Sequence, residues 1–154
     1  MNQKRSKRGR KRRPRGRKRS AAASAGFYPL YRRSVSHFRP DERELGCLLL
    51  DLGYATTEWV LFAEGVVVSS GAIPVGGRHF TADLAALLKT TTAAAERTKR
   101  MIGASLEREG LDIDAVEVPS LGGDGNHVHP ARFAAEILHE RARDLFIGVH
   151  RSLV

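Results

Sequence analysis

The chain has 154 residues, enough for one domain of ordinary size and too few for two. It carries 26 lysines and arginines against 17 acidic residues, and its single cysteine, Cys47, excludes an internal disulfide framework and a metal cage made of cysteines alone. There is no apolar run of the roughly 18 residues that spans a membrane. The basic start is not followed by the apolar segment of a secretory signal, so we expect a reducing, cytoplasmic setting.

The charge is divided between a basic arm and an acidic body. Residues 1–40 hold 15 of the basic residues and no acid, which leaves 11 basic and all 17 acidic residues for residues 41–154. Within the arm, 12 of the 16 positions in residues 4–19 are Lys or Arg. Such a block repels itself and has no apolar face to bury, so we expect residues 1–40 to be disordered.

The role of the arm has three open interpretations. Its charge, with the aromatic residues that lie among arginines in residues 27–38, would suit a nucleic acid or another anionic surface. It could equally be a solvated tail. Arginine- and proline-rich stretches also arise when GC-rich DNA is translated out of frame, which would make residues 1–40 a mis-set start or a frameshift scar and the chain a fragment.

Three strands are predicted at the start of the body. Residues 46–51 form a short apolar run that ends on an acid, which is typical of a buried strand. Residues 56–62 are rich in β-branched and aromatic side chains and predict a second strand. The turn signal Glu64-Gly65 joins it in a hairpin to a third strand, residues 66–70.

Helical spacing begins after the two adjacent glycines at residues 76–77. The further predicted elements are a helix to about residue 89, a helix over 93–102 that ends at Gly103, a strand over 115–119, a loop over 122–126, and a last helix from Pro130 to about Val149. We place His127 and His129 in the loop, because the sequence offers them no convincing further metal ligand. The order β-β-β-α-α-β-α predicts a mixed α/β layer architecture.

Two groups of residues could bind a ligand between these elements. Asp51, Gly53, Thr56 and Thr57 combine an acid at a strand end with a small-residue turn and hydroxyls, which can hold a hydrated magnesium ion and face phosphate oxygens. A plain hairpin turn explains the same residues. The glycines at 76–77 could let the backbone approach an anion, or could supply a loop with positive φ.

A third group lies on the second predicted helix. Glu96 and Lys99 are three residues apart and share a helix face, where they could engage ribose hydroxyls or form a surface ion pair. The signatures of P-loop nucleotide-binding proteins, zinc peptidases and serine hydrolases do not occur in the sequence.

Taken in order, these segments resemble the nucleotide-binding half of the FtsA family of bacterial cell-division proteins, which are actin-like ATPases. The stretches that carry the resemblance are DERELGCLLLDLGYATTEWVLFAEG, IPVGGRHFTADLAALLKT, AERTKRMIGASL and VEVPSLGG, with the helix that begins at Pro130. The resemblance covers about residues 41–154 and leaves out residues 1–40. It implies a truncated, partial actin-like (ribonuclease-H-like) domain behind the basic arm.

The resemblance also implies a site for ATP with magnesium. Asp51 would order the metal and its water, while Gly53 and Thr56 would face the β- and γ-phosphates. Glu96 and Lys99 match the helix pair that flanks ribose and adenine in the family. Thr57, Gly76 and Gly77 complete the predicted cofactor-binding set, and no catalytic residue is assigned.

Two departures from the family predict weak or absent ATP binding and little turnover by this chain. Tyr54 and Ala55 stand where the family has glycines, and their Cβ atoms limit how closely the backbone can approach a phosphate. The family's other phosphate loop, its adenosine motif and its membrane-binding helix fall outside the matched stretch.

The implied function is that of an FtsA-like cell-division component that links FtsZ filaments to the division site at the inner face of the membrane. Family members polymerise and recruit later division proteins, so FtsZ, other division proteins and a second copy of the chain are the expected partners. The alternative is a nucleic-acid-binding protein that acts through residues 4–19.

Overall fold

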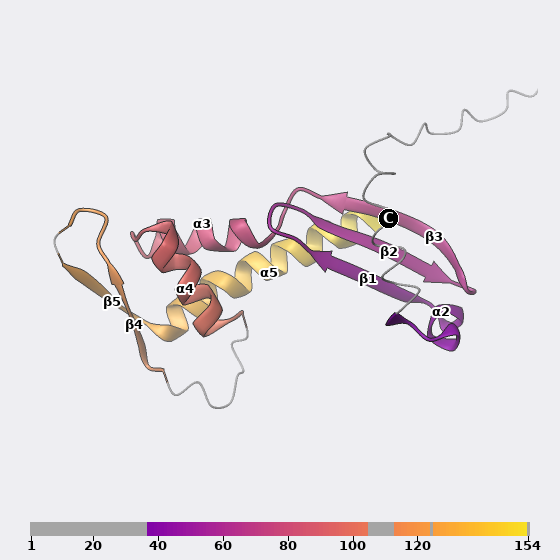
Figure 1. The fold of residues 1–154 in the computed structure, drawn as a ribbon, viewed down its shortest axis with the longest axis horizontal. Helices are drawn as coiled ribbons and strands as arrows, with labels where there is room; N and C mark the ends of the chain where they lie inside the picture. Colours follow the sequence, from indigo (N-terminus) through magenta and orange to yellow (C-terminus); the bar gives the residue numbers. More distant parts are fainter. Residues whose placement is uncertain (1–36, 105–112, 124, 154) are drawn as a thin grey trace, which may run out of the picture.

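The computed structural model describes residues 37–104, 113–123 and 125–153 (Figure 1). The elements in chain order are α2 (Pro40–Leu45), β1 (Cys47–Leu52), β2 (Thr57–Ala63), β3 (Val66–Ile73), α3 (Gly77–Leu87), α4 (Thr92–Ile102), β4 (Ala115–Pro119), β5 (Asn126–Pro130) and α5 (Ala131–Leu153). Of residues 1–40, which we expect to be disordered, residues 1–36 with the basic block lie outside the described residues.

The predicted order β-β-β-α-α-β-α is confirmed, with two short elements added. One addition is α2, which begins with Pro40 and two acids in its first turn. The Arg39 N–H donates to Glu42 Oε2 at 2.8 Å, and the helix ends at Gly46, whose φ of 103° favours glycine. With only six residues, α2 is too short to produce the apolar periodicity that identifies longer helices.

Strands β1, β2 and β3 form an antiparallel sheet in that order. The predicted hairpin is confirmed, with Glu64 and Gly65 both at positive φ in its turn. Trp59 of β2 lies opposite Gly71 of β3, where a Cβ atom would come within 2.7 Å of the indole ring. The missing side chain at Gly71 therefore provides the space that Trp59 occupies.

The prediction of a buried first strand was wrong. Every residue of β1 is at least partly exposed. Among the described residues only β2 pairs with β1, so β1 lies at the edge of the sheet. An apolar run is equally compatible with an edge strand, because periodicity does not report how many neighbours a strand has.

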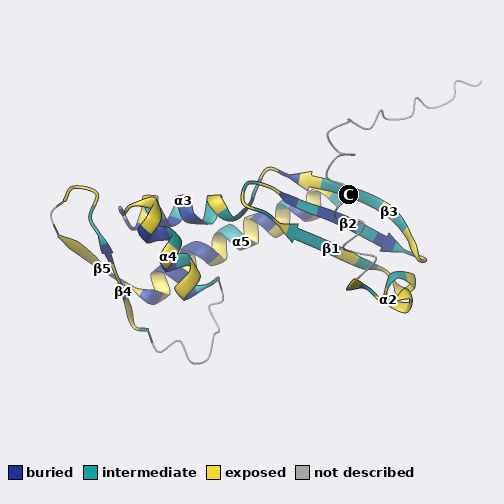
Figure 2. Cartoon of the chain, viewed as in Figure 1, coloured by how far each residue is buried: buried dark blue, intermediate teal, exposed yellow. Residues whose placement is uncertain are grey.

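Helix α5 connects two hydrophobic cores. Its C-terminal half packs beneath the sheet, where Leu145 and Val149 join Trp59 and Ile73 (Figure 1). Its N-terminal half packs against α3, α4 and the β4–β5 hairpin. Figure 2 shows buried and exposed residues alternating along α5, as expected of a helix that packs with one face.

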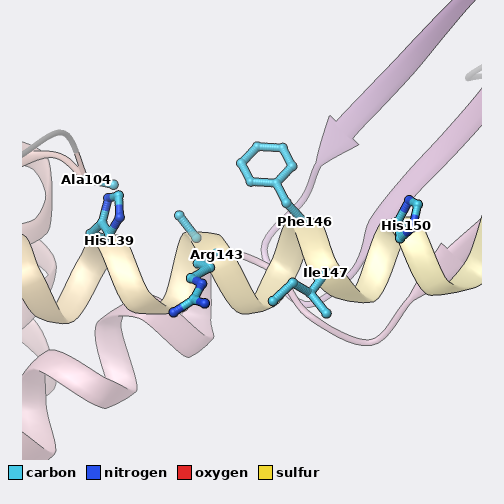
Figure 3. Close-up of a pocket in the computed structure, with 7 residues that line it drawn as sticks. Ala104, His139, Arg143, Phe146, Ile147 and His150 are labelled. Carbon is cyan, nitrogen blue, oxygen red and sulfur yellow. The ribbon is translucent and has the colours of Figure 1, made fainter.

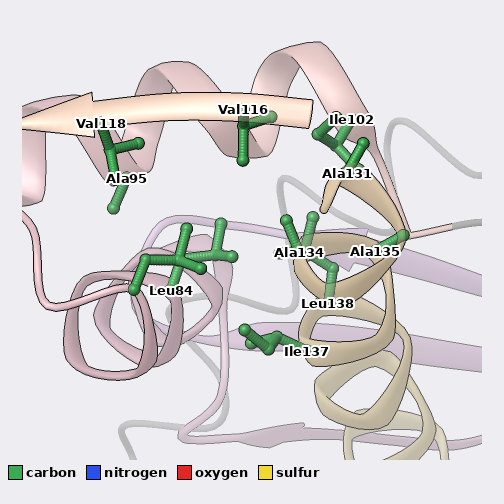
Figure 4. Close-up of a cluster of buried hydrophobic side chains, with 11 residues drawn as sticks. Leu84, Ala95, Ile102, Val116, Val118, Ala131, Ala134, Ala135, Ile137 and Leu138 are labelled. Atoms are coloured by element: carbon green, nitrogen blue, oxygen red, sulfur yellow. The ribbon is translucent and has the colours of Figure 1, made fainter. Parts of the chain in front are cut away.

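The larger core lies at the helical end of the molecule (Figure 4). It joins residues of four elements and is built mainly from small and branched apolar side chains: Leu84, Leu88, Ala95, Ile102, Val116, Val118, Ala131, Ala134, Ala135, Ile137 and Leu138. Four of these residues are alanines of α4 and α5, whose small side chains suit close packing in this core.

The assignment of His127 and His129 to a loop was also wrong. They lie on β5, opposite Val118 and Val116 of β4. Strand β5 begins at Asn126, whose Nδ2 donates to Glu117 Oε1 at 2.8 Å, so the loop ends before this residue. Local composition conceals this strand, because cross-strand pairing rather than apolar alternation forms it.

The helix boundaries agree with the predictions to within a few residues. The N-cap of α4 is Thr91, whose hydroxyl accepts the Ala94 N–H at 3.2 Å. Gly103 ends α4 at a φ of 72°, as predicted, and α5 extends four residues beyond Val149. In the described part of the chain, no helix has the length and apolar character needed to cross a membrane.

Candidate functional site

The turn between β1 and β2 lies directly against the start of α3. The Gly77 N–H donates to the Gly53 carbonyl at 2.9 Å, and the Arg78 N–H donates to the Tyr54 carbonyl at 2.8 Å. The turn itself is closed by the Gly53 N–H, which donates to the Thr56 carbonyl at 2.9 Å. Two predicted groups that are more than 20 residues apart thus form one backbone-to-backbone contact.

Gly76 makes this contact possible. A Cβ atom there would lie 2.6 Å from the Gly53 oxygen and 2.8 Å from both the Thr56 nitrogen and the Tyr54 oxygen. Its φ is −159°, so the alternative of a positive-φ loop is wrong for this residue. Glycine is required here by the close approach of two backbone segments, not by a left-handed conformation.

The N–H groups at the start of α3 already have acceptors. Besides those of Gly77 and Arg78, the Gly76 N–H donates to His79 Nδ1 at 3.0 Å and the His79 N–H donates to the Gly76 carbonyl at 2.9 Å. An anion that bound these amides would have to displace existing bonds. The anion-binding role predicted for the two glycines stays a prediction.

Asp51 and Thr57 lie at the base of the turn. Asp51 is half-buried near the end of β1, opposite Glu58 of β2. Thr57 is fully buried, and its Oγ1 donates to the Val75 carbonyl at 2.7 Å. Thr56 is exposed. Of the two threonines whose hydroxyls we predicted to face phosphate, Thr56 is exposed to solvent. The Thr57 hydroxyl instead connects β2 to the segment before α3 through its bond to Val75.

Glu96 and Lys99 share one face of α4, as the spacing predicts, and they contact each other at 2.6 Å. Glu96 Oε2 also accepts the Thr81 hydroxyl at 2.5 Å, and Glu96 Oε1 accepts Arg100 Nε at 3.0 Å. These bonds, first that from Lys99 and then that from Thr81, lower the pKa of Glu96 from 4.5 to about 2. Glu96 is therefore ionised at neutral pH.

Lys99 connects this cluster to the turn. Its Nζ donates to the Gly77 carbonyl at 3.1 Å and to Thr81 Oγ1 at 2.9 Å. A Cβ atom at Gly77 would lie 3.7 Å from both the Gly53 oxygen and Lys99 Nζ. The structure thus joins the β1–β2 turn, the start of α3 and the Glu96–Lys99 pair into one continuous polar surface, which we call the turn–α4 surface.

Sequence reasoning missed two polar contacts made by residues of α3. Thr81 joins Glu96 to Lys99, and its only signal in the sequence is its position one helical turn after Gly77. Arg141 of α5 forms two bonds to Asp83 of α3, from Nε at 2.5 Å and from the guanidinium NH2 group at 2.9 Å. The Asp83 carboxylate raises the pKa of Arg141, and a pairing over 58 residues leaves no local signal.

The donor set fits one wall of a site for a magnesium-bound nucleotide. The Asp51 carboxylate is a suitable oxygen ligand for a hydrated magnesium ion, and Lys99 supplies a cation. Among the described residues, no group of three or more His, Cys, Asp or Glu could hold a metal ion without further ligands. A metal at Asp51 would thus depend on water and phosphate oxygens for its other ligands.

The family model of cell division protein FtsA matches residues 48–139. The chain belongs to the FtsA family. The match contains the β1–β2 turn, the start of α3 and the Glu96–Lys99 pair, so the whole turn–α4 surface lies within the FtsA-like part of the chain.

Curated FtsA proteins show the same relationship. The chain is 39% identical over 94 residues to the cell division protein FtsA of Rhizobium meliloti (strain 1021), a match that covers 61% of this chain and 21% of the relative. It is 32% identical over 127 residues to FtsA of Helicobacter pylori (strain J99), covering 80% of this chain and 26% of the relative. The chain therefore spans about a quarter of the length of these relatives.

Solved structures confirm the actin-like fold. The crystal structure of MreB5 of Spiroplasma citri bound to ADP superposes with a TM-score of 0.61 at 19% identity, covering 77% of this chain and 38% of that one. The structure of the same protein bound to AMPPNP gives a TM-score of 0.60 at 21% identity, covering 70% of this chain and 35% of that one. The expected partial actin-like α/β domain is thus confirmed.

Proposed function

We propose that this FtsA-family chain acts in bacterial cell division, at the inner face of the membrane where FtsA-type proteins link FtsZ filaments to the division site. The match to the FtsA family over residues 48–139 carries this proposal. FtsZ is the proposed partner, followed by other division proteins and further copies of the chain. The nucleic-acid alternative depends on residues 4–19, and no comparison favours it.

The partnership is tested by co-sedimentation of the full chain with FtsZ filaments. We expect the chain to enter the pellet with assembled FtsZ and to stay in the supernatant when FtsZ is kept unassembled. Because the basic arm could bind acidic filaments non-specifically, the experiment is repeated at raised salt, which screens charges separated by more than a few ångströms. Pelleting that disappears with salt, or that is equal without FtsZ assembly, would contradict the proposal.

We further propose that the turn–α4 surface is one wall of a site for ATP with magnesium. Magnesium would neutralise part of the phosphate charge, and Asp51 would help to hold the ion and its water. Gly53 and Thr56 would lie beside the phosphates, close to Gly76 and Gly77, while Glu96 and Lys99 would flank the ribose. The contact of Lys99 with both Gly77 and Glu96 supports this arrangement, because it places a fixed cation between the turn and α4.

Binding is expected to be weak. The side chains of Tyr54 and Ala55 restrict the approach of a phosphate to the turn, and the N–H groups at the start of α3 are engaged. A titration with a fluorescent ATP analogue and magnesium should therefore give at most millimolar-range affinity, weakened further by Lys99→Ala. Arg100→Ala, on the same helix and also paired with Glu96, is the matched control. Micromolar binding would contradict the expected weakness, and equal effects of both variants would contradict the placement of the nucleotide at the turn–α4 surface.

A further inference from the structure

Helix α5 carries a groove along the side chains drawn in Figure 3. The groove has a volume of about 760 Å³ and begins at Ala104, just after α4. Its α5 residues are His139, Ala142, Arg143, Phe146, Ile147 and His150. Figure 3 shows the labelled side chains following one another along the helix. We call this feature the α5 groove.

The spacing of the groove residues is that of a helix-docking face. From His139 to Ala142, Phe146 and His150 the steps are three, four and four residues, and Arg143 and Ile147 are four apart. Steps of three and four place side chains in one row along a helix, and such rows pack against a second helix. The opposite face of α5 already packs in the two cores, so α5 has a second apolar face that no described residue covers.

The centre of the groove is apolar and its border is basic. Phe146 is 53% exposed and Ile147 is 38% exposed, values that are high for large apolar side chains. Arg143 and two histidines border them, and no carboxylate is among the described residues that line the groove. Arg143 approaches Glu140 only at 3.6 Å and is largely exposed, so most of its N–H donors are available to a second carboxylate.

The other flank of α5 has the opposite character. There Glu136, Glu140 and Asp144 lie with Asp83 around a separate hollow, and Arg141 is the single cation among the described residues that line it. The groove flank of α5 is therefore basic and the other flank is mainly acidic. A molecule with acidic side chains is favoured on the α5 groove.

We propose that the α5 groove docks an amphipathic helix of a partner protein, one with an apolar stripe bordered by carboxylates. The stripe covers Phe146 and Ile147, which removes their exposed surface from water. The carboxylates meet Arg143 and the two imidazoles at the border. The groove lies outside the turn–α4 surface, so this docking does not depend on nucleotide binding.

Two labelled helical peptides test the proposal by fluorescence anisotropy on the full chain. One has leucines at steps of three and four bordered by glutamates, and the other replaces each glutamate by lysine. The salt concentration is raised to screen the basic arm, which would otherwise attract any acidic peptide. We expect the glutamate peptide to bind at least about tenfold more tightly than the lysine peptide, a difference of about 1.4 kcal/mol.

Matched variants on the same helix locate the binding. Phe146→Ala should weaken the binding of the glutamate peptide by about tenfold or more, because a central aromatic side chain supplies much of the binding free energy of such an interface. Phe133→Ala changes the same residue type outside the groove and should alter affinity less than twofold. Arg143→Glu should reverse the preference between the peptides, while Arg132→Glu, an exposed arginine outside the groove, should preserve it. Far-UV circular dichroism verifies that each variant is folded.

Any of the following outcomes would overturn the proposal. The first is binding of neither peptide, or equal binding of both. The second is an equal loss of affinity with Phe133→Ala and Phe146→Ala. The third is a wild-type chain that sediments as a dimer and becomes monomeric with Phe146→Ala, which would make the α5 groove an interface between copies of this chain.

Discussion

At the scale of single residues, Gly76 carries the contact between the β1–β2 turn and α3. We expect Gly76→Ala to lower the free energy of unfolding by about 1–3 kcal/mol, because the new methyl group would meet backbone atoms of Gly53 and Thr56 that cannot move independently. Gly77→Ala is the matched control. Its Cβ would meet nothing closer than 3.7 Å, so it should be neutral or stabilising by up to about 1 kcal/mol. Urea denaturation measures both, and equal losses would contradict the close-approach argument.

The lowered pKa of Glu96 makes the free energy of unfolding depend on pH. Its pKa falls from 4.5 to about 2 in the folded chain, first because Lys99 and then because Thr81 donates to the carboxylate. A carboxylate with a lowered folded pKa stabilises the fold above its unfolded pKa, and this contribution is lost as the pH falls from about 4.5 toward 2. Glu96→Gln should therefore lose less stability than the wild type across that interval. Glu136→Gln, a variant in the surface pair with Arg132, retains Glu96 and should behave as the wild type does.

At the scale of elements, the bidentate pair of Arg141 and Asp83 fixes the position of α5 against α3. Each side chain is only 28% exposed, so removing one partner leaves the other without its hydrogen bonds in a partly desolvated position. A double-mutant cycle of Arg141→Ala and Asp83→Ala should give a coupling energy of about 1–2 kcal/mol. The same cycle at Arg132 and Glu136, an exposed pair on one helix, should give less than about 0.5 kcal/mol. Equal coupling in the two cycles would show that Arg141 is an ordinary surface contact.

The elements also show what a sequence can and cannot predict. Periodicity and glycine positions sufficed for the hairpin, for α3 and α4 with its end at Gly103, and for most of α5. Strand β5 was missed because pairing with β4, rather than its own residues, makes it a strand. The sequence was enough to predict which segments form the candidate site and their order along the chain. The hydrogen bonds from Thr57 to the Val75 carbonyl and from Lys99 to the Gly77 carbonyl could not be predicted. Each joins residues whose distance depends on the complete fold.

At the scale of the whole molecule, α5 is shared by two cores and should make them unfold together. Leu138 is fully buried in the helical core and Leu145 is fully buried beneath the sheet, seven residues along the same helix. If the sheet depends on α5 for its covering layer, loss of the helical core removes that layer too. The chain then has one cooperative transition although α5 joins two separate cores.

The single tryptophan makes this testable. Trp59 reports on the sheet core alone, while circular dichroism at the helical minimum reports mainly on α3, α4 and α5. Leu138→Ala should destabilise by about 2–5 kcal/mol and shift the fluorescence transition of the distant Trp59 by as much as the dichroism transition. Leu145→Ala, the matched substitution in the sheet core, should shift both probes together as well. A fluorescence midpoint that stays in place when Leu138 is truncated would mean that the two cores unfold independently.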